Sequence, residues 1–224
     1  MLKAKKKLTR REIKEDKLVT FYFKAQDFYR LYQKWVHYGI LAVVVLISLG
    51  IYIANSKQEA EEKASVELAR GKAAYQNEDY DVAIDILSAL TSDFSGTRAA
   101  AMGTLYLAKA YLAKKDYEQA EAYFRKYLDD YGDDPILKIA AAMGIAVVYD
   151  ERGDFEKAAE LYEEAAQMDK DSFKANELLL AAARCYKLAG KKDEATRVLE
   201  DLLERKPTGQ VATEARLYLS ELRS

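Results

Sequence analysis

The residues that carry most enzyme chemistry are scarce in this sequence. The chain has one cysteine, Cys185, and one histidine, His37. A single cysteine excludes an internal disulfide framework and a cysteine-rich zinc site, and a single histidine excludes a histidine-based metal site. The sequence also contains no G-x-S-x-G segment and no glycine-rich phosphate loop. We therefore predict a protein that is not an enzyme and uses no cofactor, metal or small-molecule substrate.

Two further features could still suggest chemistry. The segment "DDYGDDP" contains four aspartates, Asp129, Asp130, Asp133 and Asp134. It lacks the alternating ligands and the terminal glutamate of a calcium-binding EF-hand, so we favour a solvated turn in which Gly132 ends a helix. For Cys185 we favour a buried apolar filler, with a redox role in an oxidising compartment as the alternative.

Residues 35–54 read "WVHYGILAVVVLISLGIYIA" and contain no formally charged side chain. About 20 residues at 1.5 Å each cross a hydrocarbon core of roughly 30 Å. Aromatic residues near the two ends suit the membrane interface: Trp35, Tyr38 and Tyr52. We therefore predict one transmembrane helix, with a buried helix of a soluble protein as the alternative.

Charge is distributed unevenly on the two sides of this apolar stretch. Residues 1–54 contain eleven Lys and Arg against four Asp and Glu, and the rest of the chain has a net charge of −9. By the positive-inside rule, residues 1–34 stay in the cytoplasm and the C-terminal domain is exported, in a bacterium to the periplasm. A signal peptide cleaved before Lys57 is the alternative, but the 34-residue leader and the long apolar run favour a retained anchor on the inner membrane.

An aromatic stripe at helical spacing precedes the span, formed by Phe21, Ala25, Phe28, Tyr29, Tyr32 and Val36. The cations Lys24, Arg30 and Lys34 lie beside it. This composition suits an amphipathic helix in the interface with anionic membrane lipids. The alternative, which explains the leader equally well, is that its basic residues only set the membrane topology and that the residues before the span simply extend the transmembrane helix.

Four ten-residue segments after the span are near-copies: "EDYDVAIDIL", "KDYEQAEAYF", "GDFEKAAELY" and "KKDEATRVLE". Aligned on Ala83, Ala120, Ala158 and Ala195, they are 37, 38 and 37 residues apart. Small, aromatic and large apolar residues recur in the same register, and this order resembles the tetratricopeptide repeat, a helix–turn–helix unit. The "GD" or "KD" pair is expected to make the turn. This sequence departs from the family in its longer period, in the missing tryptophan of the first helix and in Lys192 at the turn aromatic.

The resemblance implies an all-α fold, with four repeats in a right-handed superhelix. We expect the repeats at about 64–97, 101–134, 139–172 and 176–209, after a helical linker at 55–63. Residues 211–224 form one more amphipathic helix, which we expect to cap the last repeat.

In this family the first helix of each repeat lines a concave groove that binds partners. Carried over position by position, the groove residues are Leu68, Lys72, Tyr75, Met102, Leu105, Lys109, Leu112, Met143, Val147, Asp150, Leu180, Arg184 and Lys187. This apolar strip with several cations suits an amphipathic helix or an extended peptide. The alternative is that some of these side chains pack against the capping helix or the domain's own N-terminal helix. The family's Lys/Asn clamp for a terminal carboxylate is not evident, because no asparagine occupies the matching positions.

The leader "LTRREIKEDKLVT", followed by one span and a repeat domain, resembles the YfgM-like proteins, which are ancillary subunits of the SecYEG translocon. This resemblance implies a scaffold whose protein partners are translocon subunits and periplasmic chaperones. Two alternatives stay open: a structural or assembly subunit of another inner-membrane complex, and an envelope-maintenance or cell-division adaptor. The acidic balance after residue 54 argues against nucleic acid as a partner.

Overall fold

The computed structural model describes residues 17–132, 134–170 and 172–223. The chain divides into two compact units, Met1–Lys57 and Gln58–Ser224. The described residues form helices and turns and contain no strand, so the prediction of an all-helical fold is confirmed. The basic residues 1–16 of the leader lie outside the described part of the chain.

The first unit contributes the start of α1, which runs from Lys17 to Gln76. Among the described residues, α1 is the helix long and apolar enough to cross a membrane, and the mean hydropathy of its apolar stretch is 2.3. The predicted interface residues are exposed, Trp35 at 75%, Tyr38 at 64% and Tyr52 at 71%. The backbone leaves helical geometry once, at Tyr32, where φ is −114° and ψ is 19°. This break lies within the aromatic stripe, a few residues before the apolar stretch that begins at Trp35.

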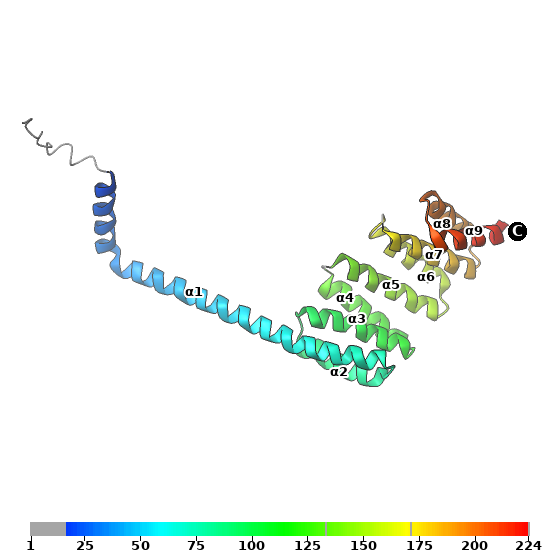
Figure 1. The fold of residues 1–224 in the computed structure, drawn as a ribbon, viewed down its shortest axis with the longest axis horizontal. Coiled ribbons are helices and arrows are strands. Elements are labelled where there is room, and N and C mark those ends of the chain that lie inside the picture. Colours follow the sequence, from blue (N-terminus) through cyan, green and yellow to red (C-terminus); the bar gives the residue numbers. More distant parts are fainter. Residues whose placement is uncertain (1–16, 133, 171, 224) are drawn as a thin grey trace, which may run out of the picture. The chain divides into compact units, whose positions relative to one another are not determined.

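The second unit is a stack of helix pairs (Figure 1). Residues 58–76 of α1, together with α3, α5 and α7, are the first helices of the pairs, which we call A helices; α2, α4, α6 and α8 are the B helices. Their bounds are α2 Tyr80–Asp93, α3 Arg98–Ala113, α4 Tyr117–Tyr131, α5 Pro135–Glu151, α6 Phe155–Gln167, α7 Phe173–Leu188 and α8 Lys192–Glu204. The last helix, α9 at Gly209–Arg223, packs against both α7 and α8.

Three A helices begin three or four residues earlier than expected, at Arg98, Pro135 and Phe173. The residue before each helix is an N-cap whose side chain accepts a backbone N–H, namely Thr97, Asp134 and Ser172. Such caps satisfy N–H groups that have no partner within the helix, and they therefore fix where a helix starts. The repeat spacing from which we expected the helix starts takes no account of these N-cap residues.

The four turns within the helix pairs share one backbone conformation. A residue with positive φ stands at the same place in each, at 37, 38 and 37 residue intervals: Glu78 (64°), Lys115 (62°), Gly153 (81°) and Gly190 (75°). The next N–H then donates to a carbonyl five residues earlier, as from Asp154 to Tyr149 at 2.9 Å. This is the Schellman ending of a helix. The predicted "GD" or "KD" pair, at Gly153–Asp154 and Lys115–Asp116, therefore supplies the left-handed residue and the N-cap of the next helix.

Glycines allow the helices to approach closely in the core. A Cβ added to Gly144 on α5 would lie 2.4 Å from the ring of Phe124 on α4. Phe124 is 1% exposed, so the ring has no open space to move into. Gly71 and Gly103 have leucine side chains from α2 at similarly short range. Small and large residues thus interlock between A and B helices, as the repeat pattern predicts.

Glu61, near the start of the repeat unit, has a role that the sequence analysis does not predict. Its carboxylate accepts the backbone N–H groups of Arg98 at 2.8 Å and Ala99 at 2.9 Å, both at the start of α3. A negative group at a helix N-terminus is stabilised by the N–H groups that have no partner there. The sequence placed Glu61 in a linker, whereas the side chain joins α1 to the second helix pair.

Candidate partner-binding face

The structure places every predicted groove residue on an A helix. Most of them are half-buried, and Lys109 is exposed. The assignment of Leu105 to the groove needs correction, because its side chain is 3% exposed and belongs to a core cluster with Phe124 and Ile145. A side chain enclosed in this way does not line a surface. We call the other predicted groove residues, together with Tyr106, the A-helix face.

At the N-terminal end of this face, two lysines flank one tyrosine ring. The ammonium groups of Lys72 on α1 and Lys109 on α3 each lie 5.3 Å from the ring centre of Tyr106. Tyr75 meets the same ring edge-on, with the ring centres 5.6 Å apart. Burial and the neighbouring tyrosines Tyr80 and Tyr106 raise the pKa of Tyr75, so it stays a neutral hydroxyl. Sequence reasoning missed Tyr106, whose role depends on a residue of another helix.

In the middle of the face, an ion pair joins α5 to α7. Arg184 contacts the Oδ2 atom of Asp150, and the Tyr162 hydroxyl lies 3.5 Å from the same atom. Next to them, Cys185 is fully buried, and burial, followed by the charge of Asp150, raises the pKa of its thiol to about 12. A thiol that stays protonated is a poor nucleophile. This environment supports the apolar-filler interpretation of Cys185.

At the C-terminal end, α9 covers part of the predicted groove. Lys187 on α7 pairs with Glu221 on α9, and its ammonium lies 5.1 Å from the ring centre of Tyr218. These contacts match the alternative that some groove positions pack against the last helix. Lys187 therefore differs from Lys72 and Lys109, because its charge is already compensated within the chain.

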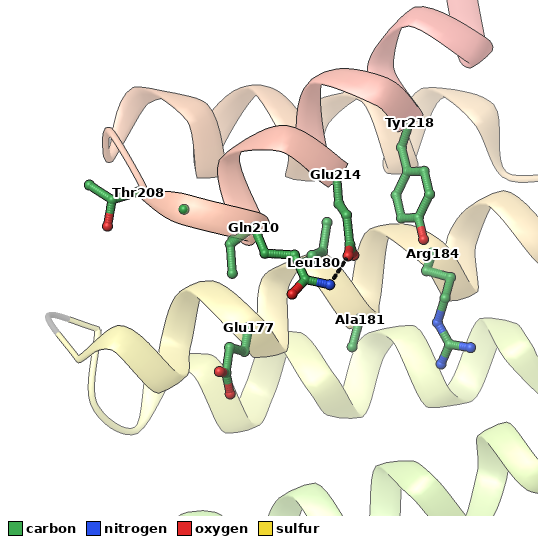
Figure 2. Close-up of a pocket in the computed structure, with 10 residues that line it drawn as sticks. Glu177, Leu180, Ala181, Arg184, Thr208, Gln210, Glu214 and Tyr218 are labelled. Atoms are coloured by element: carbon green, nitrogen blue, oxygen red, sulfur yellow. Dashed lines mark hydrogen bonds between the residues drawn. The ribbon is translucent and has the colours of Figure 1, made fainter.

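A cavity of about 500 Å³ lies between α7 and α9 (Figure 2). Its apolar lining includes Leu180, Ala181 and Val211, and its polar lining includes Glu177, Arg184, Gln210 and Glu214. Gln210 donates to the Glu214 carboxylate, and Arg184 is held by Asp150. Figure 2 shows these polar groups spread along the cavity instead of converging on one point. This geometry suits a side chain of a bound segment better than a reacting centre.

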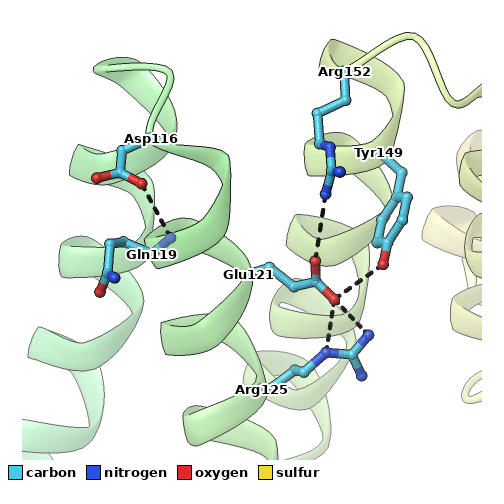
Figure 3. Close-up of polar contacts among 6 residues, drawn as sticks. All are labelled: Asp116, Gln119, Glu121, Arg125, Tyr149 and Arg152. Carbon is cyan, nitrogen blue, oxygen red and sulfur yellow. Dashed lines mark hydrogen bonds and ion pairs between the residues drawn. The ribbon is translucent and has the colours of Figure 1, made fainter.

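The B helices carry a different polar arrangement (Figure 3). Glu121 on α4 accepts the Tyr149 hydroxyl of α5 at 3.1 Å and pairs with Arg125 at 2.7 Å and Arg152 at 3.9 Å. One helix pair later, Glu163 accepts a tyrosine hydroxyl and an arginine in a similar way, from Tyr186 at 2.9 Å and Arg197 at 2.8 Å. These contacts join successive helix pairs, and their carboxylates are occupied. We therefore interpret them as structural.

The described residues contain no group of three His, Cys, Asp or Glu placed to hold a metal ion. In the "DDYGDDP" segment, Asp133 lies outside the described residues. Asp134 accepts the N–H groups of Ile136 at 2.9 Å and Leu137 at 3.1 Å and so caps α5. Its carboxylate therefore has a structural partner.

Comparison with known proteins agrees with this geometry. A model described as a tetratricopeptide repeat-like domain matches residues 26–177, and a tetratricopeptide repeat model matches residues 151–217. The chain belongs to the tetratricopeptide repeat-like family. No curated protein matches the sequence.

Solved structures show the same fold at low identity. Nearly identical TPR-like repeats from Podosopora anserina match with a TM-score of 0.59 and 16% identity, covering 72% of this chain and 86% of that one. A tetratricopeptide repeat protein from Parabacteroides merdae matches with a TM-score of 0.58 and 16% identity, covering 74% of this chain and 60% of that one. Repeats of this family are scaffolds for protein–protein interaction, and neither the family models nor these structures indicate a catalytic family.

Proposed function

We propose that the protein is a membrane-anchored scaffold of the bacterial envelope that serves the protein-export channel. In this proposal α1 crosses the inner membrane, residues 1–34 lie in the cytoplasm and the repeat unit lies in the periplasm. The observation that carries the proposal is the apolar stretch of α1, none of which is buried in the structure. Leu46 is 66% exposed and Ile47 is 57% exposed. Exposure of such apolar side chains to water is unfavourable, whereas their exposure to lipid is favourable.

The family match supports treating the anchor and the repeats as one functional unit. The tetratricopeptide repeat-like model begins to match at residue 26, before the apolar stretch, and continues to residue 177. The anchor therefore lies inside the matched region. A scaffold fixed to the membrane in this way keeps its repeat unit on the membrane where exported polypeptides emerge.

The proposed partners are subunits of the export channel and periplasmic folding factors. Purification of the tagged full chain from membranes in a mild detergent, followed by mass spectrometry, tests this assignment. We expect channel subunits to co-purify. Recovery of one unrelated membrane complex would contradict the channel assignment and favour an assembly subunit of that complex. Recovery of a shortened chain that begins near Lys57 would contradict the retained anchor and favour a released envelope adaptor.

Topology has a separate test, because the native cysteine is buried. Single cysteines introduced at Ser92 and at Gln26, both exposed positions, are labelled in spheroplasts with a membrane-impermeant maleimide. We expect Ser92→Cys to react at once and Gln26→Cys to react only after the membrane is dissolved. The unmodified chain, which has only Cys185, is the matched control and should stay unlabelled. The reverse pattern would refute the proposed orientation.

A further inference from the structure

The cations of the A-helix face fall into two groups. Arg184 pairs with Asp150, and Lys187 pairs with Glu221, so both are compensated within the chain. Lys72 and Lys109 form no ion pair within the described part of the chain. Their positive charge is therefore available to a ligand. This contrast is unexpected in a region of the chain whose net charge is −9.

The two lysines are also placed together. Each ammonium lies 5.3 Å from the same point, the ring centre of Tyr106, although one comes from α1 and the other from α3. A tyrosine ring stabilises an exposed cation only weakly, and it leaves the two like charges to repel each other. A negative ligand between or beside them relieves that repulsion. Tyr75 and Tyr106 supply an aromatic surface at the same place.

We propose that Lys72, Tyr106 and Lys109 form a docking site for an acidic segment of a protein partner, bound through its side-chain carboxylates. In an extended peptide, residues i and i+2 point to the same side and lie about 7 Å apart. Two carboxylates at that spacing can each meet one ammonium, while the residue between them lies beside Tyr106. This inference rests on the proposed scaffold function and names the chemistry of the segment that it binds.

The acidic balance of the repeat unit sharpens the selectivity of such a site. A positive patch on an otherwise acidic surface attracts an acidic segment locally, while the rest of the surface repels it. Binding therefore depends on these two lysines in particular and weakens as salt screens the charges. General electrostatic attraction to the whole domain would not show that dependence on two residues.

The test uses the full chain in a nonionic detergent and a fluorescent peptide of alternating glutamate and leucine, blocked at both ends. Fluorescence anisotropy measures the dissociation constant. We expect the double variant Lys72→Gln, Lys109→Gln to bind at least about tenfold more weakly than the native chain. The matched control is Lys126→Gln, Lys192→Gln, which removes two exposed lysines from B helices, and it should stay within about twofold. Equal binding by the two double variants would overturn the proposal.

The peptide supplies a second comparison. A glutamine version of the same peptide should bind about tenfold more weakly to the native chain, and the variant Lys72→Glu, Lys109→Glu should prefer a lysine version. Equal binding of the glutamate and glutamine peptides would show that the carboxylates are not recognised. Phosphatidylglycerol vesicles and neutral vesicles are also tested as competitors for the native chain. Displacement of the peptide by the phosphatidylglycerol vesicles, but not by the neutral ones, would assign the site to a lipid headgroup and overturn the proposal.

These outcomes are independent of the scaffold proposal itself. If the native chain does not bind the peptide but channel subunits still co-purify with it, the proposed docking site is wrong and the proposed scaffold function is unaffected. Peptide binding without any co-purified membrane complex would retain the site and remove the proposed function.

Discussion

Phe124 and Tyr106 are both aromatic residues held between neighbouring helices, but their surroundings differ. Phe124 is 1% exposed and packs against the backbone of Gly144 at a place where no extra atom fits. Tyr106 is half-buried and is flanked by the ammonium groups of Lys72 and Lys109. At Phe124 the close fit of side chains decides which residues are tolerated. At Tyr106 two lysine charges stay available to the proposed partner. Stability and binding should therefore respond to changes in different residues.

The largest effect on stability is expected from Phe124→Ala. Removing a buried aromatic ring leaves a cavity and costs about 3–5 kcal/mol in the free energy of unfolding. Urea denaturation of the full chain in detergent, followed by circular dichroism, measures this loss. Tyr106→Leu is the comparison variant and should cost much less. A loss below about 1 kcal/mol for Phe124→Ala would contradict the shape-determined packing.

The close approach of Gly144 to Phe124 gives the next prediction. Gly144→Ala should lower the free energy of unfolding by about 1–3 kcal/mol, because the added methyl group overlaps the ring. In most helices the same substitution is stabilising. Adding Phe124→Leu to Gly144→Ala should recover part of the loss, and additive losses in the double variant would show that the two residues do not interact.

The turns allow a comparison of two equivalent positions. Gly153→Ala should cost about 1–2 kcal/mol, because φ is 81° and a side chain is strained there. Lys115 already has a side chain at the matching position, with φ of 62°, so Lys115→Gly should leave stability unchanged or raise it. Thermal unfolding measured side by side distinguishes them. The same sign for both substitutions would mean that the shared turn conformation does not control stability.

The smallest effect on stability is expected on the A-helix face. Lys72→Gln and Lys109→Gln should change the free energy of unfolding by less than about 0.5 kcal/mol, because neither lysine forms an ion pair with the described residues. Recovery of partner proteins with the tagged chain should nevertheless fall. A large loss of stability would place the two lysines among the structural residues and remove the contrast with Phe124.

Much of this arrangement is readable from the sequence, since the spacing of Ala83, Ala120, Ala158 and Ala195 predicts the helix pairs and their turns. Helix starts were also encoded, in Thr97, Asp134 and Ser172, but the family pattern placed them a few residues late. The roles of Leu105, Glu61 and Tyr106 could not be predicted. A position on a helix says which side a residue faces, whereas burial and ion pairing depend on residues of other helices.

The most direct test of the A-helix face as the partner surface is photocrosslinking in intact cells. A photoreactive residue replaces Leu112, which is half-buried on α3, and in a matched strain it replaces Lys126, which is exposed on α4. Leu105 is unsuitable because it is enclosed in the core. Adducts with channel subunits or folding factors from Leu112, and none from Lys126, are the result that we predict. Equal adducts from both positions, or adducts from Lys126 alone, would contradict the A-helix face as the binding surface.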